Sequence, residues 1–330
     1  MKTIADIANL AGVAKSTVSR YLNGGSISES TKMKIERVVN NTGYVPNTFA
    51  QSLKAKKTNI IGTIVPRLDS FASSQILIGI DEQLRNLNYQ MLIANTAQNL
   101  DREIESLYNL YNQKVAGIIL LATQITDIHL EAFETIKIPV ILVGQQHDNV
   151  YSVVHDNELA GFEIGEYILK KGHRKVAYLG VSEADIAVGV KRKEGFRRAL
   201  NEKDGCEVRY YETQFAISEA VIRAGEIIDS FHPSILACAT DNIALGALKA
   251  AHVRGLNIPT DLSITGFGGY EVTEIIHPAL TTIKFNYTNA GRDAANGIIK
   301  LVNGEMFPMI TSSEHELIER ESVDSKTIER

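Results

Sequence analysis

Cysteine and tryptophan are nearly absent from this chain, which has two cysteines and no tryptophan among 330 residues. Cys206 and Cys238 stand far apart and lack the spacing of metal ligands, so neither a disulfide framework nor a zinc site is indicated. The chain also lacks an apolar run of about 20 residues, the length needed to cross a membrane. Its first helical pattern contains Asp6, where a signal peptide would be apolar. We therefore expect a cytoplasmic protein that makes no membrane contact.

Motifs of catalysis are missing as well. The sequence has no GxxxxGKS or GxxxxGKT phosphate loop, no G-x-S-x-G elbow and no HExxH motif, and GFGGY does not have the GxGxxG spacing of a dinucleotide site. His155 and Asp156 follow an expected strand, but no nucleophile stands at a motif beside them, and a lone histidine is more often structural. We expect a binding protein rather than an enzyme, with no cofactor and no metal.

Charge is divided unevenly along the chain. Residues 1–57 hold nine Lys or Arg against three Asp or Glu, a net of +6. The remaining residues hold 25 against 36, a net of −11, and the two parts together give the overall −5. A basic segment joined to an acidic one is typical of a nucleic-acid-binding module attached to a domain that must not bind phosphate nonspecifically.

The basic segment has helix-turn-helix spacing. In IADIANLAGVAKSTVSRYLN, a helix from Ile4 ends before Gly12, where a tight turn accepts positive φ, and a second helix begins at Lys15. A third helix is expected between a Ser28 cap and a Gly43 stop. The first two helices alone are also compatible with a plain helical hairpin that has a basic face, and the third helix favours the DNA-binding interpretation. The apolar positions of a small core are Ile4, Ile7, Val13, Val18 and Leu22.

A short helix of sequence NTFAQSL is expected after Pro46. A helix of this length is not stable alone in water. We expect it to fold when DNA and a partner subunit cover its apolar face, which includes Phe49 and Leu53.

From Thr58 onward, β-branched apolar runs alternate with helical patterns. Runs such as NIIGTIV, AGIILLA and PVILVG are continuous, as in parallel strands buried on both faces. The same alternation of strand and helix patterns repeats in a second half, which contains the apolar runs KVAYLG, SILACAT and LSITGFGG. These patterns predict two doubly wound parallel-sheet subdomains with a ligand cleft between them, beyond the carboxyl ends of the strands.

Polar and aromatic residues gather at those strand ends. Such amides, hydroxyls, charged groups and rings suit a sugar, because planar groups bind paired hydroxyls and rings cover the apolar faces of sugars. Each is also compatible with a loop position that has no role. The strand-end residues are Pro66 to Phe71, Gln145, Gln146, Ser182 to Asp185, Asp241, Tyr270, Phe285 and Asn286.

Four segments, IADIANLAGVAKSTVSRYLN, YVPN, TDNIALGALKA and HPALTTIKF, resemble the LacI/GalR family of sugar-responsive repressors. The resemblance covers essentially the whole chain, and it implies an all-α helix-turn-helix head and an α/β body like a periplasmic binding protein. The implied domains are a helix-turn-helix domain at 1–45, a hinge helix and linker at 46–57, and a sugar-effector-binding and dimerisation domain at 58–330. In the last, an N-subdomain would comprise about 58–157 and 285–309, and a C-subdomain about 158–284 and 310–330.

The resemblance also implies which residues contact DNA. Lys15, Ser16 and Arg20 would reach base edges in the major groove. Thr17, Ser19 and Asn23 would hold phosphates, while Asn47, Ala50 and Leu53 of the hinge helix would meet the minor groove, Leu53 as the wedge that kinks the operator centre. Two such wedges require two-fold symmetry, which implies a homodimer on a palindromic operator and a place in the nucleoid.

For the body, the resemblance implies an effector site in the cleft. Gly268 stands where the family often has an aspartate, so that contact is not expected in this chain. The segments IVPRLDSFASSQ, VHDN and GFGGYE are most similar to those of sucrose operon repressors. Arg67 would either bind a phosphate group on the sugar or pair with Asp69. The expected effector-binding residues are Arg67, Ser70, Phe71, Gln145, Asp156, Arg192, Asp241, Tyr270 and Phe285.

The implied function is repression of a sucrose-type utilisation operon, with release from the operator by a sugar or sugar phosphate. A regulator of the catabolite-control type, which uses a phosphoprotein corepressor, is the nearer alternative. A sugar-binding receptor for transport would not carry a basic helix-turn-helix head. A cytoplasmic sugar enzyme would need a nucleophile, paired carboxylates or a phosphate loop in the cleft.

Overall fold

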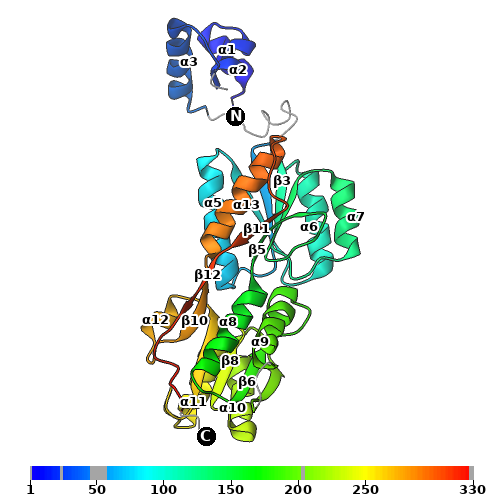
Figure 1. Cartoon of the computed structure of the whole chain (residues 1–330). Coiled ribbons are helices and arrows are strands. Elements are labelled where there is room, and N and C mark those ends of the chain that lie inside the picture. The colour runs from blue at the N-terminus through cyan, green and yellow to red at the C-terminus, as the bar shows by residue number, and fades with distance from the viewer. Residues whose placement is uncertain (1, 23–24, 45–57, 202–204, 327–330) are drawn as a thin grey trace. The chain divides into compact units, whose positions relative to one another are not determined.

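The computed structural model describes residues 2–22, 25–44, 58–201 and 205–326. It divides the chain into two compact units, Met1–Thr58 and Asn59–Arg330. We call the first the head and the second the body, and each is described by itself (Figure 1).

The described part of the head consists of three helices, α1 (Ile4–Ala11), α2 (Lys15–Leu22) and α3 (Glu29–Thr42). Thr3 caps α1: its side chain accepts from the Asp6 N–H at 3.3 Å, and its own N–H donates to the Asp6 carboxylate at 2.8 Å. Gly12 and Gly43 end α1 and α3 in the left-handed conformation, at φ 65° and 59°. The predicted helix-turn-helix region is therefore confirmed.

A small apolar core holds these helices together. Ile7 of α1, Val18 of α2 and Ile35 of α3 are fully buried against one another, and Tyr44 closes the cluster. The hydroxyl of Tyr21 donates to the Glu36 carboxylate at 3.3 Å and ties α2 to α3. Each helix supplies one fully buried side chain to this core. Truncation of one of these side chains to alanine would leave a cavity and lower the free energy of unfolding by about 2–5 kcal/mol.

The body contains two six-stranded sheets, each the centre of one subdomain. The first has the order β11-β5-β4-β3-β1-β2, with all neighbours parallel. Helices α5 (Phe71–Asn86) and α13 (Tyr287–Val302) cover one face, and α6 (Leu100–Asn112) and α7 (Asp127–Ile136) cover the other (Figure 1). The strands are β1 (Ile60–Val65), β2 (Gln90–Asn95), β3 (Gly117–Leu120), β4 (Val140–Val143), β5 (Tyr151–His155) and β11 (Ile310–Ser313).

The second sheet has the order β12-β10-β9-β8-β6-β7. Helix α8 (Asn157–Lys170) packs on α9 (Arg192–Asn201), and α10 (Ile217–Phe231) packs on α11 (Asp241–Val253). A π-helix, η1 (Ile186–Lys191), leads into α9, and a short helix, α12 (Val272–Ile275), follows β9. The strands are β6 (Lys175–Gly180), β7 (Glu207–Glu212), β8 (Ile235–Cys238), β9 (Ser263–Gly268), β10 (Thr281–Phe285) and β12 (His315–Ile318).

Two details of the body differ from the predicted pattern. Strand β12 runs antiparallel to β10, so the second sheet is parallel except at this edge. Strand β11 pairs with β5 in the first sheet, so the subdomain boundary predicted at residue 309 was placed too early. Only Glu314 separates β11 from β12, and the segment carries no glycine or proline that would mark the change of sheet.

The chain passes between the two subdomains three times. It crosses after β5 at His155, after β10 at Phe285, and between β11 and β12 before His315. These three crossings are the places where the chain links the two subdomains, so they can serve as the pivot about which the subdomains rotate. In the described part of the chain, no helix is both long and apolar enough to span a membrane.

Candidate functional site

The outward face of α2 is basic. Lys15, Ser16 and Arg20 are exposed, while Thr17 and Ser19 are half-buried. Helix α2 carries two cations and no carboxylate, so its exposed face suits a phosphate-lined groove. The predicted contacts Asn23, Asn47, Ala50 and Leu53 lie outside the described residues.

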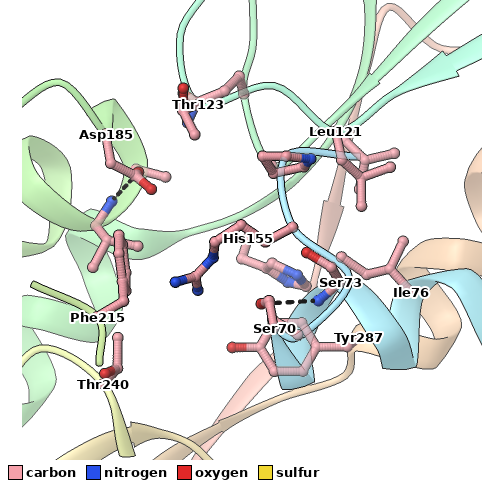
Figure 2. A pocket seen from close by; sticks show the side chains of 18 of the residues that line it. Ser70, Ser73, Ile76, Leu121, Thr123, His155, Asp185, Phe215, Thr240 and Tyr287 are labelled. Atoms are coloured by element: carbon pink, nitrogen blue, oxygen red, sulfur yellow. Dashed lines mark hydrogen bonds between the residues drawn. The ribbon is translucent and has the colours of Figure 1, made fainter. Parts of the chain in front are cut away.

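A cavity of about 150 Å³ lies between the two subdomains of the body, at the carboxyl ends of the strands, where the sequence predicts it. Arg67, Ser70 and Gln145 reach it from the first subdomain, and Arg192 and Tyr270 reach it from the second. Figure 2 shows Asp185, Phe215 and Thr240 on one side of this space and Ser70, Ser73 and Ile76 on the other. Five of the nine predicted effector-binding residues therefore line one cavity.

Arg192 is the most firmly held of these residues, with 4% of its surface exposed. Its Nε and Nη2 donate to the Asn157 side-chain oxygen at 3.2 and 2.6 Å, and its Nη1 donates to the Ala239 carbonyl. The guanidinium lies between two rings, with Cζ 4.6 Å from the Phe267 centroid and 5.1 Å from the Phe285 centroid. These acceptors are neutral, and the Asp185 and Asp241 carboxyl groups interact with the guanidinium only electrostatically, so the guanidinium can still pair with a ligand in the cavity.

Asp241 is buried beneath the cavity and does not line it. Its carboxylate accepts from the Tyr270 N–H at 2.8 Å and from the Thr282 hydroxyl at 2.6 Å. Burial raises the pKa of Asp241 to about 6, although these hydrogen bonds and Arg192 act in the opposite direction. Its neighbour Thr240 reaches the cavity instead. Asp241, expected from the sequence to contact the effector, therefore lies outside the cavity wall and hydrogen-bonds Tyr270, which is part of that wall.

The backbone conformation at position 268 and the nearby Tyr270 ring explain why this chain has glycine there. Its φ of 142° is one that side chains rarely adopt, and a Cβ there would lie 2.3 Å from the Tyr270 ring. An aspartate at this position would displace the ring from the cavity wall. Glycine at position 268 therefore allows the Tyr270 ring to occupy its place in the cavity wall.

Three further predicted residues lie near the cavity but not in its wall. The Phe71 ring stacks behind Tyr270, with centroids 4.2 Å apart. Phe285 packs beneath Arg192, as described above. The Asp156 side chain accepts from the Leu159 N–H at 2.9 Å, so this residue caps α8. These three support the site rather than form it.

The structure also adds wall residues that sequence reasoning missed, namely Asn157, Phe215, Thr240 and Tyr287. Thr240 follows a predicted strand, so its place in the cavity wall could have been predicted from its position in the sequence. Phe215 and Tyr287 carry no motif and reach the cavity only through the fold. His155, interpreted from the sequence as structural, also lines the cavity.

Two more charged groups complete the wall. The Arg67 guanidinium lies over the Phe215 ring, 4.7 Å from its centroid, and its Nε is 3.8 Å from the Asp69 carboxylate. Asp185 caps η1 by accepting from the Val188 N–H at 3.0 Å, and burial raises its pKa. Within the described ranges, no group of three His, Cys, Asp or Glu could hold a metal ion. The arrangement is that of a binding site.

Comparison with known proteins agrees with this architecture. Residues 3–47 match the family described as bacterial regulatory proteins, lacI family, and residues 166–323 match a periplasmic binding protein-like domain. The chain is 40% identical over 307 residues to the sucrose operon repressor of Staphylococcus xylosus, which covers 93% of this chain and 95% of that protein. It is 29% identical over 310 residues to catabolite control protein A of Priestia megaterium, covering 92% and 93%.

A solved structure of the lac repressor dimer bound to operator and the anti-inducer ONPF has the same fold, with a TM-score of 0.90 at 22% identity over 98% of this chain and 99% of that one. Together, the matches define a bacterial DNA-binding regulator with a periplasmic-binding-protein-like body. The chain belongs to the lacI family of bacterial regulatory proteins.

Proposed function

We propose that this protein is a homodimeric repressor of a sucrose-type utilisation operon, released from a palindromic operator when a sugar or sugar phosphate binds in the body cavity. The observation that carries the proposal is Arg192, a buried cation whose described hydrogen bonds go to neutral acceptors and which faces a cavity walled by rings and hydroxyls. The similarity to a sucrose operon repressor supports the choice of sugar.

The chemistry of the wall suits a carbohydrate. The planar guanidinium of Arg192 and the amide groups of Gln145 and Asn157 are suited to adjacent hydroxyls. The rings of Tyr270 and Phe215 offer flat apolar surfaces for the C–H faces of a sugar. Arg67, half-buried at the same cavity, supplies a second cation that would meet a phosphate group on the sugar.

Binding in this cavity would change the relative position of the two subdomains, because contacts cross it on several sides. Arg67 contacts Phe215 across the cavity, Phe71 contacts Tyr270, and the Ile186 N–H donates to the Thr123 carbonyl at 3.3 Å. A ligand that binds one arrangement more tightly shifts the population toward it. A coupling of about 1–3 kcal/mol would lower operator affinity about 5- to 150-fold.

On the DNA side, we propose that Lys15, Ser16 and Arg20 contact base edges and that Thr17 and Ser19 contact phosphates. The exposure of the first three on one helix face supports this assignment. The roles of Asn23 and of the hinge residues Asn47, Ala50 and Leu53 remain predictions from the sequence, as does the homodimer that pairs two hinge segments.

The test is fluorescence-anisotropy binding of the purified protein to DNA upstream of its own operon, at one fixed salt concentration. The titration is repeated with sucrose, fructose, glucose and their phosphates. A sugar that lowers operator affinity supports the proposal and identifies the ligand. If the protein binds DNA but no sugar changes the affinity, the proposal fails in favour of a protein corepressor, the alternative raised by similarity to catabolite control protein A.

A further inference from the structure

Four aromatic rings meet where the chain crosses between the two subdomains. His155 ends β5, Phe285 ends β10, Tyr287 begins α13 and His315 begins β12, so each crossing contributes to the cluster. The His155 ring lies 5.0 Å from Phe285 and 5.1 Å from Tyr287, and Phe285 lies 5.9 Å from His315. We call these four residues the pivot cluster. A rotation of the subdomains must slide these rings over one another.

His155 differs from the other histidine of the pivot cluster, His315. The His315 Nε2 lies 3.0 Å from the Glu163 carboxylate, so that ring has a partner. Both ring nitrogens of His155 are buried and have no hydrogen-bond partner among the described residues. Buried polar atoms are usually paired, and an unpaired one costs about 1–3 kcal/mol. The same ring lines the cavity, beside Ser70 and Tyr287 in Figure 2.

The surroundings of His155 determine which ligand group it suits. Burial lowers the pKa of His155 to about 4, and the nearby Arg192 and His315 act in the same direction. The ring is therefore neutral at physiological pH, with one N–H donor and one acceptor. A hydroxyl group both donates and accepts, so it matches this ring, whereas a phosphate group matches Arg67 and Arg192 better.

We propose that His155 binds a hydroxyl group of the effector and transmits its presence to the pivot cluster. This inference rests on the proposed function, since it requires the cavity to bind a sugar. It assigns two separate properties to one side chain. The ring nitrogens supply effector affinity, and the ring itself, packed against Phe285 and Tyr287, supplies the coupling between the cavity and the movement of the subdomains.

Two substitutions separate these properties. His155→Phe keeps a ring in the pivot cluster and removes the nitrogens, whereas His155→Ala removes both. His252→Phe is the matched control, because His252 is an exposed residue of α11. Each full-length variant is titrated with sucrose, fructose and their phosphates by calorimetry. Its operator affinity is then measured by anisotropy, without sugar and with saturating sugar.

For His155→Phe we expect sugar affinity to fall by about tenfold or more, with sugar-free operator affinity within twofold of the wild type. For His155→Ala we expect the same loss of sugar affinity and, in addition, a weaker response to sugar. The response is the operator affinity without sugar divided by the operator affinity with saturating sugar, and this ratio should fall. Wild-type sugar affinity in His155→Phe would overturn the binding role. A wild-type ratio in His155→Ala would overturn the coupling role. Failure of the wild-type protein to bind any of these sugars would instead count against the proposed function.

Discussion

The rings of Phe71 and Tyr270 stack with centroids 4.2 Å apart and an interplanar angle of 33°, although they belong to different subdomains. Phe71 begins α5 beside the first sheet, and Tyr270 follows β9 of the second. The stack holds the cleft closed at the point where Tyr270 forms part of the cavity wall. Its strength therefore contributes to the balance between the two arrangements of the subdomains.

Removal of this stack should weaken effector binding. In Phe71→Ala, the loss of an aromatic pair worth about 0.5–1.5 kcal/mol beyond its buried area favours the open arrangement. We expect sugar affinity to fall by roughly 2- to 15-fold in calorimetric titration. Leu68→Ala, at an exposed position in the loop that leads into α5, is the control. Equal effects of the two substitutions would show that the loop, and not the stack, matters.

Replacement of Arg192 by lysine should produce a repressor that binds its operator and no longer responds to sugar. Lysine keeps the charge but loses the planar fork that donates to Asn157 and stacks between Phe267 and Phe285. We expect sugar affinity to fall by more than about tenfold. Arg197→Lys, at an exposed position of the same helix, controls for the change of residue type. Normal induction in the Arg192 variant would remove this residue from the site.

Asp241 should make the stability of the body depend on pH. Its pKa is raised by burial from 3.8 to about 6, so the folded chain binds this proton more tightly than the unfolded chain. The contribution of Asp241 is therefore fully present below about pH 4 and is lost as pH rises through about 6. The loss amounts to about 3 kcal/mol.

The measurement compares urea unfolding of the wild type with that of Asp241→Asn between pH 4 and pH 7. An asparagine can still accept from the Tyr270 N–H and can donate to the Thr282 hydroxyl, so the substitution suits the site. Histidines that titrate in the same range are common to both proteins and cancel in the difference. The wild type should lose stability relative to the variant as pH rises. A difference that does not change with pH would show that Asp241 is ionised throughout.

Arg20 should contribute to operator recognition and little to the stability of the head, because its side chain is exposed on α2. For Arg20→Gln we expect a loss of about 1–3 kcal/mol in binding to the specific operator, with sugar affinity unchanged. Lys34→Gln removes the same charge from an exposed position of α3. Anisotropy with specific and nonspecific DNA separates the two effects. Similar losses for both variants on both DNAs would reduce Arg20 to a general electrostatic role.

The sequence predicts the head well because its signals are local. The turn at Gly12 and the stop at Gly43 each act within one helical turn, and the structure places both as predicted. Ser28 also stands at the predicted N-cap position of α3, although its side chain makes no capping hydrogen bond there. The positions of Arg67, Ser70 and Gln145 in the cavity were also predictable. Each follows a buried parallel strand, and parallel strands bring their carboxyl ends to the same edge of a sheet.

The pair Thr240 and Asp241 shows that position at a strand end does not determine which of two adjacent side chains reaches the cavity. Both stand at the end of β8 and the start of α11, and the sequence points to Asp241, whereas the structure places Thr240 in the cavity wall. At a helix N-terminus, adjacent side chains point in different directions, so the orientation of the whole helix decides which one reaches the cavity. The packing of α11 against β9 buries Asp241 beneath Tyr270 and leaves Thr240 at the wall.

By itself, the sequence determined the helix-turn-helix head, the two parallel α/β subdomains and the edge of the sheets at which the cavity lies, because helix caps, glycine turns and apolar periodicity are properties of neighbouring residues. Only the tertiary structure decided that Phe215 and Tyr287 join the cavity, that Asp241 does not, and that His155 stands unpaired in the pivot cluster. These facts depend on contacts between segments far apart in the chain, and no local pattern of residues records the distance or the direction of such contacts.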